Sequence, residues 1–152
     1  MIVTDHAEDF SSDKVEKFID DCEKISGKGF LAVPGLEFAI DKEREIHLLV
    51  VGLEKQHLQN GIDGILERVW QGENHSFAVL AHPSRSRHYV PQGYDTKIHG
   101  IEVWNSAYNT RYLPDHEAIR LFKDLYREAI RAYRIRLTIE EILLHRARGP
   151  QC

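Results

Sequence analysis

The sequence contains few cysteines, no long apolar segment and no large excess of charge of either sign. Its two cysteines, Cys22 and Cys152, are too few for the disulfide framework of a small secreted domain. No apolar run approaches the ~20 residues that a membrane helix needs, and the N-terminus lacks the basic and then apolar start of a secretory signal. These absences predict a cytoplasmic protein without a membrane span.

The charge balance also bears on possible partners. A net charge of −4 disfavours general binding to the phosphate backbone of nucleic acid. Segment 126–152 is rich in arginine, which is typical of a solvated helical face. The alternative, a nucleic-acid module built on this segment, would need the interleaved aromatic residues on which bases stack, and these are lacking. We therefore expect nucleic acid only as a substrate.

Histidine is present in unusual number, with nine among 152 residues. This length fits a single domain, residues 1–152, with a real hydrophobic core. The proportions of 42% hydrophobic and 29% charged residues are ordinary for a globular protein. The informative histidines are those that lie where an ordinary surface histidine would not.

Apolar periodicity predicts alternating strands and helices. Strands are expected at residues 1–5, 29–40, 44–53, 77–83 and 100–106. The second strand is expected to bend at Pro34–Gly35, and the third to be buried on both faces. Helices are expected at residues 13–26, at 58–69 and from Pro114 onward. Strands separated by helices indicate an α/β fold with a largely parallel sheet.

Polar residues occur at the ends of several predicted strands. In chain order they are His6, Glu37 after the Pro-Gly bend, His82 and Asn105. In α/β folds with parallel strands, active sites form at the C-terminal ends of the strands. We therefore expect these side chains to meet at one rim of the sheet.

His47 is different because it lies inside an apolar strand. A buried imidazole needs a partner for each ring nitrogen, and a metal ion would supply one of them. The predicted ligand set is His6, Glu37, His47 and His82, a combination that suits zinc, manganese or iron. A bridging carboxylate would also allow two ions about 3.5–4 Å apart, as in many phosphatases.

Each of these residues also has a structural interpretation. A histidine inside a strand is commonly a hydrogen-bonded core residue. His82 before Pro83 fits a turn, and Glu37 fits an ion pair with a nearby lysine or arginine. Arg85, in the loop after His82, fits either a phosphate contact or an exposed basic loop. The set indicates a metal site more strongly than any single member.

Five segments resemble, in order, the motifs of one family. They are VTDH (3–6), VPGLEF (33–38), IHLLVVGL (46–53), LAHP (80–83) and IEVWNS (101–106). They resemble the PHP family (polymerase and histidinol phosphatase) over residues 1–125. The resemblance implies a distorted, TIM-like β/α barrel, here partial. It also implies two or three divalent ions at the strand ends and hydrolysis of a phosphorylated small molecule or nucleotide by a metal-bound hydroxide.

The resemblance implies a role for each site residue. His6 would be a metal ligand, Glu37 would bridge two ions, and His47 and His82 would share one of these ions with Glu37. Glu37 and His82 would thus be the catalytic residues. Around them, Asp5, Asn105 and Arg85 would support the ligands or contact the substrate.

Two motifs of the family have no counterpart in this sequence. A His-x-His motif would precede residue 1 and an Asp-x-His motif would follow the last helix, and both supply metal ligands. We therefore expect a domain truncated at both ends, with an open strand edge at residues 1–5 and impaired phosphoesterase activity. The alternative is a non-catalytic remnant that acts as a weak metal-binding or interaction module.

Overall fold

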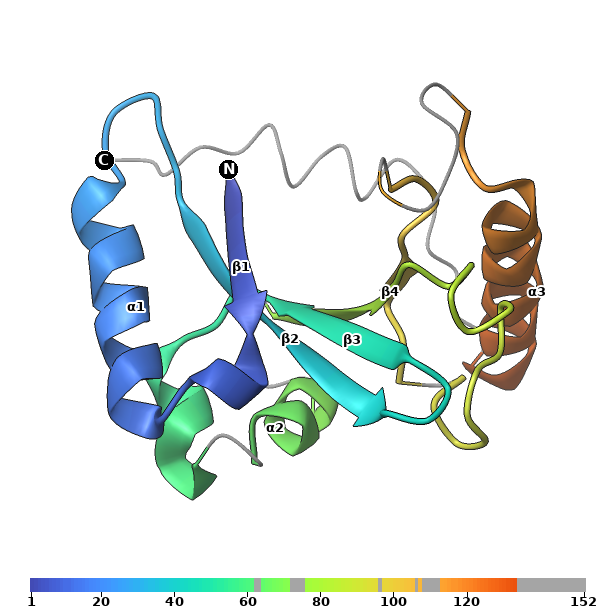
Figure 1. The fold of residues 1–152 in the computed structure, drawn as a ribbon, viewed down its shortest axis with the longest axis horizontal. Coiled ribbons are helices and arrows are strands. Elements are labelled where there is room, and N and C mark those ends of the chain that lie inside the picture. The colour runs from blue at the N-terminus through green and yellow to red at the C-terminus, as the bar shows by residue number, and fades with distance from the viewer. Residues whose placement is uncertain (62–63, 72–75, 96, 106, 108–112, 134–152) are drawn as a thin grey trace.

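A five-stranded sheet with the order β1-β2-β3-β4-β5 forms the centre of the molecule (Figure 1). Its strands are β1 (Ile2–His6), β2 (Val33–Asp41), β3 (Ile46–Val51), β4 (Phe77–Ala81) and β5 (Gly100–Ile101). The structure is a computed structural model that describes residues 1–61, 64–71, 76–95, 97–105, 107 and 113–133. Because the order in the sheet is the order in the chain, consecutive strands are neighbours, as is common in small domains.

The sheet is mixed, so the prediction of a largely parallel sheet is wrong. The β1–β2 and β4–β5 pairs are parallel, whereas the β2–β3 and β3–β4 pairs are antiparallel. The link between β2 and β3 consists of residues 42–45. Such a short link can reverse the chain, but it cannot form the crossover that two parallel strands require.

The described strands form an open sheet, which corrects the prediction of a partial TIM-like barrel. β1 and β5 are its two edges, and within the described ranges no strand pairing joins them. A β/α barrel needs a repeated parallel strand–helix unit and closure of the sheet. The β2–β3 hairpin interrupts that repeat, and the result is a small mixed α/β sheet with three α-helices.

Strand β2 continues through Pro34 and Gly35 without the predicted bend. Pro34 is the second residue of the strand, close to the end where proline is tolerated, and its carbonyl accepts hydrogen bonds from the backbone N–H groups of Gly52 and Leu53. Gly35 allows β3 to approach closely, because a Cβ atom there would lie 2.7 Å from the carbonyl oxygen of Val50. The Pro-Gly pair therefore serves strand packing rather than a turn.

The helices are α1 (Ser12–Ile25), α2 (Ile65–Gln71) and α3 (His116–Tyr133), with short 3-10 helices η1 (Ala7–Asp9) and η2 (Lys55–Asn60). Val15, Ile19 and Cys22 form the buried face of α1. The single helix predicted at 58–69 is instead divided between η2 and α2. Of the arginine-rich segment 126–152, α3 includes residues up to Tyr133, and residues 134–152 lie outside the described part.

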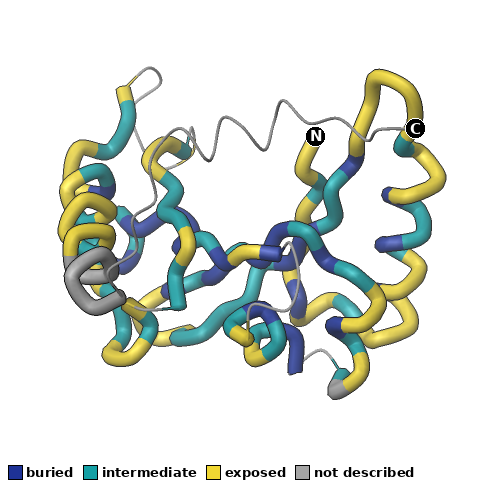
Figure 2. The backbone as a smooth tube through the Cα atoms, turned by 180° about the vertical axis from the view of Figure 1, so that it is seen from behind, coloured by how far each residue is buried: buried dark blue, intermediate teal, exposed yellow. Residues whose placement is uncertain are grey.

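The hydrophobic core lies against one face of the sheet. Leu36, Val50 and Ala78 of the sheet pack with Val15 and Ile19 of α1, and Figure 2 shows buried residues concentrated in the strands and on the inner sides of the helices. A second cluster of sheet residues, Ile46, Leu48 and Leu80, has Leu121 of α3 packed against it. Because side chains alternate along a strand, these residues all point to the same side of the sheet.

The opposite face of the sheet is less covered and carries the polar residues. In β3 the buried Ile46 and Leu48 alternate with His47 and Leu49, which are partly exposed, while Val51 on the face of His47 is buried. Glu37 pairs with Leu49 and lies on the same side. Helices thus support the sheet from one side, while the other side presents the candidate ligands.

Candidate metal centre

Glu37, His47 and His82 bring three metal-binding atoms together. His47 Nδ1 lies 2.6 Å from Glu37 Oε1 and 3.1 Å from His82 Nε2. His82 Nε2 lies 3.7 Å from Glu37 Oε1. The chain segments that carry these atoms are separated by up to 45 positions in sequence, and the sheet alone makes them neighbours.

Strand register explains why these three side chains converge. Glu37 of β2 pairs with Leu49, which is two residues from His47 on the same side of β3. His47 in turn pairs with Ala81, the last residue of β4 and the one before His82. Diagonal neighbours on adjacent strands lie within reach of long side chains. The hairpin and β4 therefore hold the ligand set in place.

The side chains of the cluster are largely buried. The exposed fraction of the side chain is 7% for His82 and 20% for Glu37. Burial lowers the pKa of His82 below its ordinary value of 6.5, although the nearby Glu37 carboxylate opposes this shift. The lowered pKa favours the uncharged imidazole, which is the form that binds a metal ion.

The spacing of the donor atoms fits one divalent ion. The three atoms all lie within 4.8 Å of one another. A tetrahedral ion with metal–ligand distances of ~2.0–2.1 Å separates its ligands by roughly 3.3 Å, close to the distances seen between these atoms. Two histidines and one glutamate, with a remaining position for water or substrate, are also a known ligand set of catalytic zinc sites.

His6 and Asp5 lie next to this cluster without joining it. His6 pairs with Glu37 in the parallel β1–β2 register, and its ring centroid lies 6.4 Å from that of His47. The carboxylate of Asp5 accepts a hydrogen bond from the backbone N–H of His6 at 2.8 Å. The structure therefore places the predicted fourth ligand beside the cluster, with Asp5 supporting its backbone.

Glu102 is a site residue that the sequence analysis missed. Its carboxylate accepts a hydrogen bond from the backbone N–H of His82 at 2.5 Å, and the same oxygen lies 3.7 Å from His82 Nδ1. Asn105, predicted to support the ligands or contact the substrate, donates from Nδ2 to the other carboxylate oxygen of Glu102 at 3.1 Å. A signal was available, because Glu102 directly follows the short β5 strand within the IEVWNS segment.

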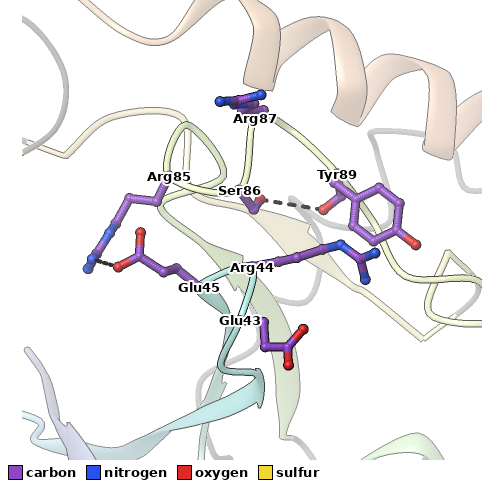
Figure 3. Close-up of a pocket in the computed structure, with 7 residues that line it drawn as sticks. All are labelled: Glu43, Arg44, Glu45, Arg85, Ser86, Arg87 and Tyr89. Carbon is purple, nitrogen blue, oxygen red and sulfur yellow. Dashed lines mark hydrogen bonds and ion pairs between the residues drawn. The ribbon is translucent and has the colours of Figure 1, made fainter.

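Arg85, the predicted phosphate contact, lies in a neighbouring cavity. Its guanidinium pairs with Glu45 in the β2–β3 turn, and Arg44 of the same turn stacks over the Tyr89 ring, with its guanidinium carbon 5.0 Å from the ring centroid. The cavity has a volume of about 590 Å³ and is lined by Glu43, Arg44, Glu45, Arg85, Ser86, Arg87 and Tyr89 (Figure 3). None of the three clustered ligands lines it, and its two glutamates offset much of the arginine charge.

Comparisons with protein-family models, with curated proteins and with solved structures found no match to this chain. Among the described residues, no helix is both long enough and apolar enough to cross a membrane. The resemblance to the PHP family is therefore supported by sequence motifs alone. The candidate metal centre is supported by its geometry, because Glu37, His47 and His82 form a cluster that could hold a metal ion.

Proposed function

We propose that this protein is a metal-dependent phosphoesterase of the PHP type, whose ion is held by Glu37, His47 and His82. The observation that carries the proposal is the convergence of two imidazole nitrogens and one carboxylate oxygen on a half-buried sheet face. This ligand set suits zinc, manganese or iron. The ordered motifs, from VTDH to IEVWNS, support phosphate esters as the substrate class, with a phosphorylated small molecule or nucleotide as the substrate.

The residues of the chain have separable roles in this proposal. A bound divalent ion would act as a Lewis acid toward phosphate oxygens and would lower the pKa of water. Glu37 and His82 hold that ion as the catalytic residues, and His47 completes the set. His6 is the proposed ligand of a second ion, because its strand register places it beside Glu37.

A non-catalytic metal-binding module is the second candidate. The position of His6 favours this candidate. The ring centroid of His6 lies 6.4 Å from that of His47, and His6 is not part of the cluster of Glu37, His47 and His82. The cluster alone offers ligands for one ion, whereas the resemblance to the PHP family implies a reaction that uses two or three divalent ions. In this case the protein would bind metal through the same residues without turnover.

Hydrolysis of an aryl phosphate by the full chain tests the proposal. The chain would be purified, stripped with a chelator and assayed with added Mn²⁺, Zn²⁺ or Fe²⁺. We expect metal-dependent turnover that is lost in Glu37→Ala and His82→Ala. The control is His116→Ala, which removes an exposed imidazole from α3 and should retain turnover.

The outcomes separate the two candidates. Turnover that depends on Glu37 and His82 supports the phosphoesterase. Metal binding without turnover on aryl monoesters or diesters favours the non-catalytic module. A chain that neither binds a divalent ion nor turns over overturns both.

A further inference from the structure

The backbone at His82 adopts a conformation that its sequence disfavours. His82 has a φ angle of 29°, in the positive region where residues other than glycine are uncommon. It also precedes Pro83, and residues before proline prefer an extended conformation. A conformation of this kind persists only when surrounding contacts hold it in place. The question is therefore which contacts fix His82 at the end of β4.

The carboxylate of Glu102 contacts His82 both at its backbone and beside its ring. Its Oε2 atom accepts a hydrogen bond from the backbone N–H of His82 at 2.5 Å. The same oxygen lies 3.7 Å from Nδ1 of the His82 ring, while Nε2 on the other side of the ring faces Glu37 and His47. Glu102 thus contacts both the backbone and the outer side of a residue whose inner side faces the metal centre.

Glu102 is itself fixed by Asn105. The Asn105 side chain donates from Nδ2 to Oε1 of Glu102 at 3.1 Å, and its Oδ1 accepts a hydrogen bond from the backbone N–H of Ala107 at 2.9 Å. The backbone N–H of Glu102 also bonds to the carbonyl of Leu80 in β4 at 2.9 Å. Both ends of Glu102 are therefore tied to neighbouring structure.

We infer that Glu102 is a positioning residue of the metal centre, that it holds His82 with Nε2 directed at the ion, and that Asn105 orients Glu102. This inference rests on the metal site of the proposed function. Carboxylates behind metal-binding histidines fix ring orientation, and their loss typically lowers metal affinity about 10–100-fold. The effect on the ion is indirect, because Glu102 is not a member of the ligand cluster itself.

A donor–acceptor exchange tests the inference. In Glu102→Gln the side-chain carbonyl oxygen can still accept the hydrogen bond from the His82 N–H. The new amide NH₂ group, however, faces the NH₂ group of Asn105, so two hydrogen-bond donors oppose each other. The double variant Glu102→Gln/Asn105→Asp reverses the donor and acceptor and restores the hydrogen bond. It also preserves the net charge, and the carboxylate introduced at position 105 can still accept from the Ala107 N–H.

Metal affinity of the full chain is the first readout. We expect Glu102→Gln to weaken binding of Zn²⁺ about 10–100-fold in a competition titration, and the double variant to recover most of that loss. Glu23→Gln, the same chemical change at an exposed position of α1, should leave affinity unchanged. Circular dichroism establishes that each variant is folded.

The absorption spectrum of bound Co²⁺ is the second readout, because it reports ligand geometry around the ion and not stability. The spectrum should change in Glu102→Gln and return to that of the wild type in the double variant. If the wild type binds metal but the affinity and spectrum of Glu102→Gln match it, the inference is overturned and the proposed function stands. If the wild type binds no divalent ion, both are overturned.

Discussion

The Nδ1 atom of His47 lies 2.6 Å from a carboxylate oxygen of Glu37 and 3.1 Å from Nε2 of His82. One proton on Nδ1 satisfies the Glu37 carboxylate as a hydrogen-bond acceptor, but two histidine nitrogens and a carboxylate facing one another are better satisfied by a shared cation. We therefore expect one metal ion to bind all three side chains. Removal of any one of them should abolish or weaken binding of that ion to the other two.

The first prediction is that a divalent ion stabilises the folded chain through these residues. At a free Zn²⁺ or Mn²⁺ concentration 100 times the Kd, the free energy of unfolding should rise by about 2.7 kcal/mol, because the ion binds the native state. Thermal unfolding with metal and after chelation measures this change. In His47→Ala the metal-dependent shift in Tm should vanish, while it should persist in His116→Ala; an unaltered shift in His47→Ala would contradict the proposed site.

The second prediction concerns the close approach of β2 and β3. Gly35→Ala places a Cβ atom 2.7 Å from the carbonyl oxygen of Val50, so the two strands must separate. We expect a loss of about 1–3 kcal/mol in the free energy of unfolding, as for other overpacked sites, measured by urea denaturation. Gly27→Ala is the matched control, because no atom lies within 4 Å of its new Cβ; equal losses in both variants would argue against the packing explanation.

The third prediction concerns Asp115, which caps α3. Its Oδ1 accepts hydrogen bonds from the backbone N–H groups of Glu117 and Ala118 at 2.9 and 3.1 Å, and its Oδ2 lies 2.7 Å from His88 Nε2. Replacing such a cap by alanine typically costs about 0.5–2 kcal/mol. Asp115→Ala should lower the free energy of unfolding by this amount at neutral pH, and Asp115→Asn by less, because asparagine can also cap.

The pH dependence of this effect follows from the pKa of Asp115. Burial raises that pKa, but the hydrogen bonds from His88 and from the α3 backbone outweigh it and set the pKa below its ordinary value of 3.8. A lowered pKa in the folded state means that the stabilisation is complete above about pH 4 and is lost as pH falls through the folded pKa. The difference between wild type and Asp115→Ala should thus be lost below this range; a difference that persists well below the folded pKa would contradict the assignment.

The sequence predicted the elements better than their directions. Continuous apolar runs locate β3 and β4, and apolar residues at helical spacing locate α1. The strand directions differ from the prediction because the chain reverses at residues 42–45 and does not bend at Pro34–Gly35. An apolar run identifies a buried strand, but it does not say whether the next strand returns beside it or crosses over.

The candidate site was predictable to the extent that its residues stand out chemically. His47 inside an apolar strand and His82 at a strand end were conspicuous, and the structure brings both to Glu37. Glu102 was not conspicuous, because an acidic residue after a strand is common on protein surfaces. Its role depends on the positive φ angle of His82 and on the hydrogen bond from the backbone N–H of His82, which no sequence pattern reveals.

Anomalous X-ray diffraction at the zinc absorption edge, from crystals of the full chain grown with Zn²⁺, would show directly whether Glu37, His47 and His82 hold one ion. We expect an anomalous peak at about 2.0–2.2 Å from His47 Nδ1, His82 Nε2 and a Glu37 carboxylate oxygen, and no such peak in Glu37→Ala. Crystals that bind zinc elsewhere on the molecule, with no peak between these three side chains, would contradict this expectation.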